Sequence, residues 1–210
     1  MALQGLGSLW VSRSAVLRAS EITDDCGACG VFRGALSESM LLAIAVGREC
    51  LTMAGIAVPV PTSVRAGVVH GTSRGDSYAE ERSSALLAQG RRRMSPSEFG
   101  RLVHNSSAGA ASLALGLRGP QIVCFSGDPL VAAAHQIMAG RCQLMLVFAT
   151  LGSDDSAQTS TFQAFGILVT DGRVGSGARY PLVEVCASKT VVSPESALLS
   201  CCLRTRSLAG

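Results

Sequence analysis

The chain has 210 residues, of which 48% are hydrophobic and 16% charged, and its net charge is +3. This length suits one ordinary globular domain, and the composition excludes a disordered tail or a solvated spacer. The small charge, without a basic stripe between aromatics, argues against nucleic-acid binding. Because the apolar stretches are too short to cross a bilayer and no signal-peptide pattern opens the chain, we expect a soluble, cytoplasmic protein that does not associate with membranes.

The first part of the chain predicts a strand, a polar stretch, a long buried helix, a second strand and a second helix. In chain order, these elements are expected at Ala2–Trp10, at Ser14–Gly34 (a loop or short helix), and at Glu38–Ala54, Ser63–His70 and Tyr78–Gln89. The long helix has Ser37 or Ser39 as its N-cap and ends at Gly55. Its apolar side chains surround the helix, so we expect it to be buried on most sides.

The second part continues with helical residues that Gly119-Pro120 terminates, followed by strands and one more helix. The expected elements are helix Ala108–Leu117 after a helical start near Ser95, strand Gln121–Phe125, helix Leu130–Ala139, and strands Gln143–Ala149, Phe162–Thr170 and Pro181–Ala187. Strands that alternate with helices and are almost continuously apolar predict an α/β fold, with a sheet covered on both faces.

The chain has eight cysteines, scattered and partly inside apolar runs. In a reducing compartment such cysteines behave as small hydrophobic residues. Cys26 and Cys29 form one C-x-x-C pair, but no second pair completes a zinc site. We therefore expect no metal and no cofactor.

Gly71-Thr72-Ser73-Arg74-Gly75 matches the G-x-S-x-G pattern of a serine nucleophile between a predicted strand and a predicted helix. Asp128 and His135 follow in the order of a catalytic triad. Against this reading, few strands precede Ser73, and the histidine is expected inside a helix. The alternative is a glycine-rich turn, where glycines supply unusual backbone angles.

The stretch from Pro96 to Ala149 carries the most information. Its motifs are Val103-His104-Asn105, Ala108-Gly109, Leu117-Arg118-Gly119-Pro120 and Ser126-Gly127-Asp128. In their order and spacing these motifs resemble the N-terminal half of the β-ketoacyl synthases, which have the thiolase fold. The chain is most similar to short ketosynthase-like partners of the chain-length-factor type, such as those of aryl-polyene pathways. The resemblance implies a single ketosynthase-like N-terminal domain over residues 1–210, a thiolase-like half with a mixed, mostly parallel sheet.

A ketosynthase condenses acyl units with a cysteine nucleophile, placed where the strand after Gly-Pro gives way to a helix. Counted from Gly119-Pro120, that position is Asp128. A carboxylate cannot replace the thiolate that carries an acyl thioester. Cys124 lies four residues earlier, on the predicted strand, where we expect a packed and inert thiol, with a reactive thiol as the alternative. None of the histidines, His70, His104 and His135, matches the family's catalytic pair.

In the resembling family, the strand after Gly-Pro pairs antiparallel with a partner subunit. The resemblance therefore implies an interface at Gln121, Ile122, Val123, Cys124 and Phe125. We expect a non-catalytic subunit that forms a heterodimer with a ketosynthase and shapes the tunnel for a polyketide, polyene or fatty-acid-like chain on an acyl carrier protein. Bulky tunnel residues are expected at Phe125, Met138 and Phe148.

Two other hypotheses remain open from the sequence. One is a small hydrolase or acyltransferase that uses Ser73 or Cys124 as its nucleophile. The other is a homodimeric binding module that pairs through the same edge strand.

Overall fold

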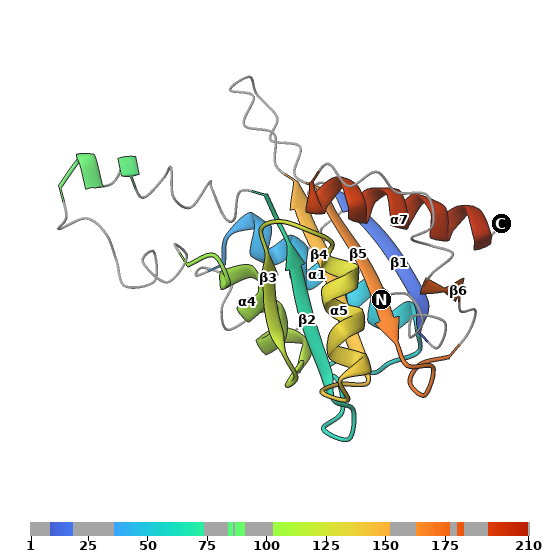
Figure 1. Cartoon of the computed structure of the whole chain (residues 1–210). Coiled ribbons are helices and arrows are strands. Elements are labelled where there is room, and N and C mark those ends of the chain that lie inside the picture. The colour runs from blue at the N-terminus through green and yellow to red at the C-terminus, as the bar shows by residue number, and fades with distance from the viewer. Residues whose placement is uncertain are drawn as a thin grey trace.

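The computed structural model describes residues 9–18, 36–73, 84–85, 87–90, 103–151, 163–176, 180–182 and 193–209. Six strands form one sheet in the order β3-β2-β4-β5-β1-β6 (Figure 1). The strands are β1 Trp10–Arg18, β2 Ala66–Gly71, β3 Gln121–Cys124, β4 Leu144–Leu151, β5 Gln163–Thr170 and β6 Tyr180–Pro181. The helices are α1 Glu38–Met53, α4 Ser106–Leu115, α5 Pro129–Met138 and α7 Pro194–Ala209.

The sheet is mixed, and most of its strands run in one direction. β2 pairs parallel with both β3 and β4. β5 pairs antiparallel with β4 and with β1, so β1 runs in the same direction as β2, β3 and β4. The short β6 is antiparallel to β1. The expected α/β class with a mixed sheet is therefore confirmed. Four of the six described strands share one direction, although only two of their five pairings are parallel.

Helices cover both faces of the sheet and give the domain two apolar cores. On one face, α1 and α4 pack on β2, β4 and β5 through residues such as Leu42, Leu115 and Leu146. On the other face, α5 and α7 enclose a second core that includes Leu130, Leu198 and Val147. β2 and β4 are buried along nearly their whole length because they lie between the two cores.

The long helix forms as the sequence predicts. Ser37 is the N-cap, and its hydroxyl accepts a hydrogen bond from the backbone N–H of Met40. The helix ends at Met53, and Gly55 follows with a positive φ of 69°. Serine caps and left-handed glycines are the ordinary start and stop signals of a helix.

The expected strands at 63–70, 121–125, 143–149 and 162–170 and the expected helix at 130–139 are all present, with ends shifted by a few residues. The described residues 84–85 and 87–88, inside the second predicted helix, are helical. The predicted strand Ala2–Trp10 lies outside the described residues except for its last two positions. The start near Ser95 and the residues Cys26 and Cys29 also lie outside them.

One expectation is wrong, one lies mostly outside the described residues, and one helix was not predicted. Residues 14–18, expected in a loop or short helix, belong to β1. A bulge between Val11 and Arg13 interrupts the two-residue alternation by which a strand is recognised. The strand expected at Pro181–Ala187 is observed only as Tyr180–Pro181, and residues 183–187 are outside the described part. Helix α7 was not expected, because its sequence is balanced between polar and apolar residues.

Within the described residues, no helix combines the length and the apolarity that crossing a membrane requires. The described cysteines form no disulfide with one another. Four of them, Cys50, Cys142, Cys201 and Cys202, are buried, as expected for small hydrophobic side chains.

Candidate functional site

The residues singled out from the sequence gather where β2 and β3 end. The two strands are parallel, with Gly71 paired to Cys124, so their carboxyl ends lie at the same edge of the sheet. The backbone N–H of Thr72 donates to the Cys124 carbonyl at 2.9 Å and extends this pairing by one residue. A Cβ on Gly71 would lie 2.9 Å from Pro129 and 3.2 Å from Pro194. Glycine therefore lets the first turns of α5 and α7 close on β2.

Asp128 is the residue at the expected nucleophile position, and it caps a helix. It is the N-cap of α5, with extended backbone angles and Pro129 directly after it. Its Oδ1 accepts a hydrogen bond of 3.0 Å from the Leu130 N–H. A carboxylate at this place satisfies an otherwise unpaired backbone donor and complements the positive end of the helix dipole.

Cys124 is the last residue of β3 and is only partly exposed. Burial raises the pKa of its thiol, and the neighbouring charge of Asp128 raises it further. The thiolate is the nucleophilic form of cysteine. The local electrostatics therefore keep Cys124 in its unreactive, protonated form.

Ser73 is exposed at the end of β2 and is bound to an acidic residue that the sequence analysis did not single out. Both its backbone N–H and its hydroxyl donate to Oε1 of Glu195, the hydroxyl at 2.9 Å. Glu195 lies in the first turn of α7 and is only 3% exposed. Burial raises the pKa of this carboxyl, but hydrogen bonds from the Ser73 N–H and from neighbouring groups outweigh it and lower the pKa overall. Ser73 therefore donates to a carboxylate rather than to a histidine.

His70 is close in sequence to Ser73 but belongs to the core. The imidazole is 1% exposed, and its ring stacks on Phe148 with centroids 4.6 Å apart. Neither ring nitrogen has a hydrogen-bond partner among the described residues. Burial lowers the pKa of His70 to about 4, although Glu195 acts in the opposite direction. The ring is therefore neutral near pH 7 and has no contact through which it could activate Ser73.

Asp128 and His135, the other two residues of the serine-triad pattern, have different structural roles. Asp128 caps α5, and His135 is exposed two turns further along the same helix. The Ser73 hydroxyl thus donates to Glu195, whereas a catalytic triad would require it to donate to a histidine.

The residues expected at an interface lie at an edge of the sheet. β3 is the terminal strand and, within the described ranges, pairs only with β2. Gln121 is exposed, and Ile122, Val123 and Cys124 are partly exposed. Phe125 follows directly, is 46% exposed and meets the ring of His104 edge to face at 5.0 Å.

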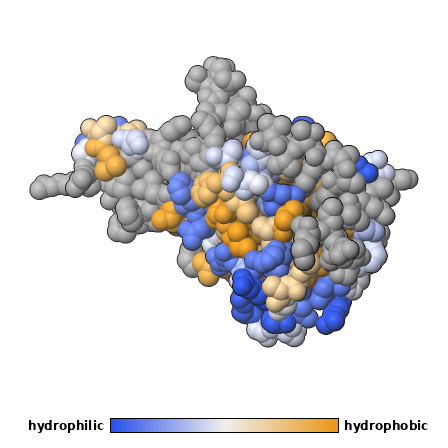
Figure 2. Space-filling model, viewed as in Figure 1, coloured by the Kyte–Doolittle hydropathy of each residue, from blue (hydrophilic) through white to orange (hydrophobic). Residues whose placement is uncertain are grey.

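The residues expected in a tunnel lie in two environments. Phe125, four residues before α5, and Met138, its last residue, are about half exposed, whereas Phe148 is fully buried against His70. The outer side of α5 also exposes Val131. Figure 2, seen from the side on which α5 lies in front of the sheet, shows apolar surface gathered near the centre of this face among hydrophilic side chains.

Glu195 could have been suspected from one signal. Ser193-Pro194-Glu195 has a capping residue, a proline and an acid in the order typical of a helix start. No sequence pattern predicts its contact with Ser73, because the two residues are 122 positions apart. Among the described residues, no group of three His, Cys, Asp or Glu side chains is arranged to hold a metal ion.

These observations define the class of the protein: a thiolase-like α/β half in which the turn from the edge strand to the next helix holds a carboxylate. The β-ketoacyl synthase N-terminal domain family matches residues 32–179. The chain belongs to this family.

Known relatives agree with this assignment. Nodulation protein E of Rhizobium sp. (strain N33) is 34% identical over 112 residues, which are 50% of this chain and 28% of that protein. The ketosynthase in complex with its chain length factor from Xenorhabdus doucetiae is similar in structure, with a TM-score of 0.52 at 22% identity, over 67% of this chain and 61% of that one. The ishigamide ketosynthase/chain length factor gives a TM-score of 0.59 at 14% identity, over 84% and 65% of the two chains. The chain thus spans less than two thirds of each of these relatives.

Proposed function

We propose that this protein is a non-catalytic, chain-length-factor-like subunit that pairs with a ketosynthase through β3. Together the two would elongate a polyketide, polyene or fatty-acid-like chain carried on an acyl carrier protein. The single observation that carries the proposal is Asp128, a helix-capping carboxylate at the position where the family's acyl-carrying cysteine is expected. A carboxylate forms no thioester, so the condensing thiol must come from the partner.

The nearest thiol does not compensate for this change. Cys124 lies four residues before Asp128, at the end of β3. Its side chain is partly buried, and the charge of Asp128 disfavours its thiolate. A nucleophilic cysteine needs the opposite surroundings, an electropositive site that lowers its pKa.

The exposed edge of the sheet supports the pairing. β3 is short, carries Ile122 and Val123, and has one side without a strand neighbour in the described part of the chain. Edge strands of this composition pair readily with another chain. Two structurally similar solved proteins are ketosynthases with a chain length factor, which fits a partner of that kind.

The tunnel role rests on Phe125 and Met138. α5 has ten residues and is therefore about 15 Å long. Val131 and Met138 are exposed on it two turns apart, and Phe125 precedes it by four residues. In the proposed arrangement, an acyl chain that ran along this helix would contact all three. Phe148 is enclosed by the core beside α1, so it is proposed only as a support for the sheet beneath this surface.

The test is co-expression with a ketosynthase encoded near this chain. We expect a stable heterodimer on size exclusion, and chain elongation by the complex that survives Cys124→Ala in this subunit but not replacement of the partner's cysteine. Ile122→Lys should break the complex, because lysine on an edge strand opposes pairing. Val16→Lys on the opposite edge is the matched control. Loss of elongation with Cys124→Ala, or no complex with any such ketosynthase, would overturn the proposal.

A second candidate function, hydrolysis or acyl transfer by Ser73, is favoured by one contact. Ser73 is an exposed residue, and its hydroxyl donates to the buried carboxylate of Glu195. A fluorophosphonate probe tests it: the non-catalytic proposal expects no labelling of Ser73, whereas labelling that Glu195→Gln abolishes would establish a serine enzyme.

A further inference from the structure

One end of the sheet carries a row of arginines. The row is formed by the three residues before β2, before β3 and before β4, and by the three residues after β5. β5 runs antiparallel to β4, so it ends beside the start of β4. Each of these four segments contains one exposed arginine. In the order of the strands they are Arg118, Arg65, Arg141 and Arg173, and we call this row the arginine rim.

Backbone hydrogen bonds hold the segments of the rim side by side. The Gly119 N–H donates to the Ala66 carbonyl at 2.7 Å, which joins the start of β3 to that of β2. The Gln143 N–H donates to the Arg65 carbonyl at 2.8 Å, and the Gln143 carbonyl accepts from the Asp171 N–H at 3.2 Å. Because neighbouring strands lie about 4.8 Å apart, the rim is about 14 Å long.

The rim has a surplus of positive charge. The one acidic residue of the four segments, Asp171, serves its own turn, where Oδ1 accepts from the Arg173 N–H at 2.9 Å and Oδ2 lies 3.9 Å from Arg173 Nε. Within the described part of the chain, no carboxylate forms an ion pair with Arg65, Arg118 or Arg141. The surplus of three positive charges equals the formal net charge of the whole chain.

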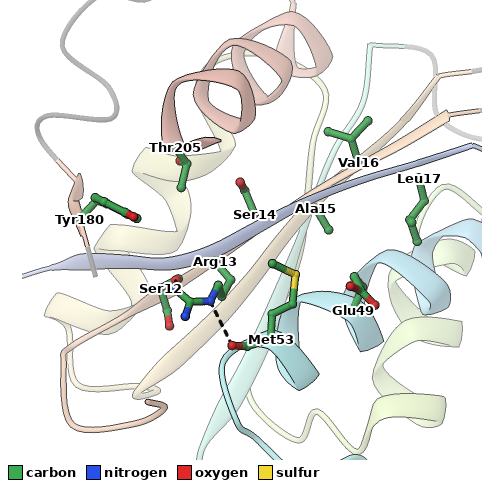
Figure 3. A pocket seen from close by; sticks show the side chains of 10 residues that line it. All are labelled: Ser12, Arg13, Ser14, Ala15, Val16, Leu17, Glu49, Met53, Tyr180 and Thr205. Atoms are coloured by element: carbon green, nitrogen blue, oxygen red, sulfur yellow. Dashed lines mark hydrogen bonds between the residues drawn. The ribbon is translucent and has the colours of Figure 1, made fainter. Parts of the chain in front are cut away.

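Arg13, a further cation near this end of the sheet, is used inside the molecule. It belongs to a hollow of about 540 Å³ along β1, whose lining includes Met53 of α1 and Thr205 of α7 (Figure 3). Its Nε donates to the Met53 carbonyl at 3.0 Å, and its Nη1 donates to the Ser12 carbonyl at 2.9 Å. We therefore do not count Arg13 as part of the rim.

The rim lies at the far end of the strands from the candidate site. Ser73 and Cys124 lie at the carboxyl ends of β2 and β3, whereas the rim lies at the amino ends of the same strands. Figure 2 shows hydrophilic side chains gathered at the lower end of the molecule, where these amino ends lie in Figure 1. The rim is therefore a surface of its own, separate from the candidate site.

We infer that the arginine rim binds an acidic α-helix of a partner protein, laid across the ends of the strands. An α-helix repeats its face about every 5.4 Å, close to the strand spacing of about 4.8 Å. One carboxylate per helical turn thus meets one arginine per strand, and over the whole rim the two spacings differ by only about 2 Å. Arginine holds a carboxylate through two parallel hydrogen bonds, which favours such a match.

Other anionic partners fit the rim less well. In an extended segment, side chains on one face repeat about every 6.8 Å, so the mismatch across the rim grows to about 6 Å. DNA-binding proteins commonly contact about 6–10 phosphates, more than four arginines in one short row reach. The spacing and the number of charges therefore favour a helix of a few turns.

The test is the binding of a synthetic helix to this chain, measured by fluorescence anisotropy. The probe is a labelled, alanine-based peptide with four glutamates spaced four, three and four residues apart, so that all of them share one face. The control peptide has the same four glutamates distributed around the helix. We expect the one-face peptide to bind at least about fivefold more tightly, because only its carboxylates meet the rim together.

Charge-reversal variants assign the surface. Arg65→Glu, Arg118→Glu and Arg141→Glu should each weaken binding of the one-face peptide by about fivefold or more. Arg18→Glu makes the same change of net charge at the opposite end of the sheet, where β1 ends, and should leave the affinity unchanged.

Three results would overturn the inference. The first is no binding of the one-face peptide, or equal binding of the two peptides. The second is an equal loss of affinity in Arg18→Glu and in the rim variants, because net charge alone would then explain the binding. The third is tighter binding of a DNA duplex or of phosphatidylglycerol vesicles at the same salt concentration. All of these measurements use this chain alone, so their outcome is separate from the pairing with a ketosynthase.

Discussion

His70 is a buried imidazole whose nitrogens find no hydrogen-bond partner in the described part of the chain. Its pKa is about 4 in the folded protein against an ordinary 6.5, so the folded state resists protonation. The stability linked to this residue is complete above about pH 6.5 and falls as the pH drops toward 4, by about 3 kcal/mol in all.

Replacing the ring with phenylalanine should remove this pH dependence. His70→Phe keeps an aromatic ring against Phe148 but cannot take up a proton. Urea unfolding at several pH values should give a flatter stability profile between pH 6.5 and 4 than the unmodified protein shows. His135→Gln, at an exposed position of α5, is the control and should keep the original slope. A slope unchanged in His70→Phe would assign the dependence to other groups.

Asp128 makes a similarly local prediction. Asp128→Ala should lower the free energy of unfolding by about 1 kcal/mol, because the Leu130 N–H loses its acceptor. Asp128→Asn keeps an oxygen at the N-cap and should retain most of that stability. Thermal or urea unfolding compares the two variants. Equal losses in both would show that the charge, not the cap, is what stabilises the start of α5.

At the scale of elements, two glycines near α4 differ sharply in the space around them. A Cβ on Gly119, which precedes β3, would lie 2.8 Å from the backbone oxygen of Ala66. Nothing lies within 4 Å of the Cβ position of Gly109, inside α4. Close approach of the backbone holds β3 beside β2 at Gly119, whereas Gly109 only weakens its helix.

The same substitution should therefore have opposite effects. Gly119→Ala should destabilise the protein by roughly 1–3 kcal/mol, and Gly109→Ala should stabilise it by about 0.5–1 kcal/mol. The pair can be compared in one unfolding series, and each variant is the other's control. A stabilising Gly119→Ala would mean that the link between α4 and β3 can move away from β2 without loss.

The elements that the sequence predicted are those whose pattern is local. α1 has a serine cap and a glycine stop, and β2 and β4 are apolar throughout because both of their sides are buried. Residues 14–18 were not predicted as part of a strand because the bulge in β1 breaks the alternation and Ser12 and Ser14 are buried polar residues. α7 has no strong apolar stripe, and its docking depends on partners far away in sequence.

The candidate site divides in the same way. The place of Asp128 between β3 and α5 could be predicted, because both elements have local signals after Gly119-Pro120. The surroundings of Cys124 and the bond between Ser73 and Glu195 depend on how α5 and α7 close over β2. No short stretch of sequence contains that information.

At the scale of the whole molecule, the proposed contact with a ketosynthase lies at one end of the sheet. β3 would pair with the ketosynthase, and the strands β2, β4 and β5 separate it from β1. Co-expressed with its ketosynthase, the protein should therefore form a complex that depends on β3 and not on β1.

Native mass spectrometry can test this dependence. Ile122→Lys should release this chain without any ketosynthase, whereas Val16→Lys should leave the complex in place. A complex that survives Ile122→Lys would contradict a contact through β3.

The hydrogen bond from Leu130 to Asp128 also has a consequence for how this protein changes over evolutionary time. If the proposed role is correct, a single reversion to cysteine would not simply return a lost activity, since it would also remove the cap of α5 and leave Cys124 beside it in a packed strand end. The intermediate would be less stable before it was useful. The loss of stability on replacing this carboxylate would therefore make a return to catalysis less accessible than continued evolution as a non-catalytic partner.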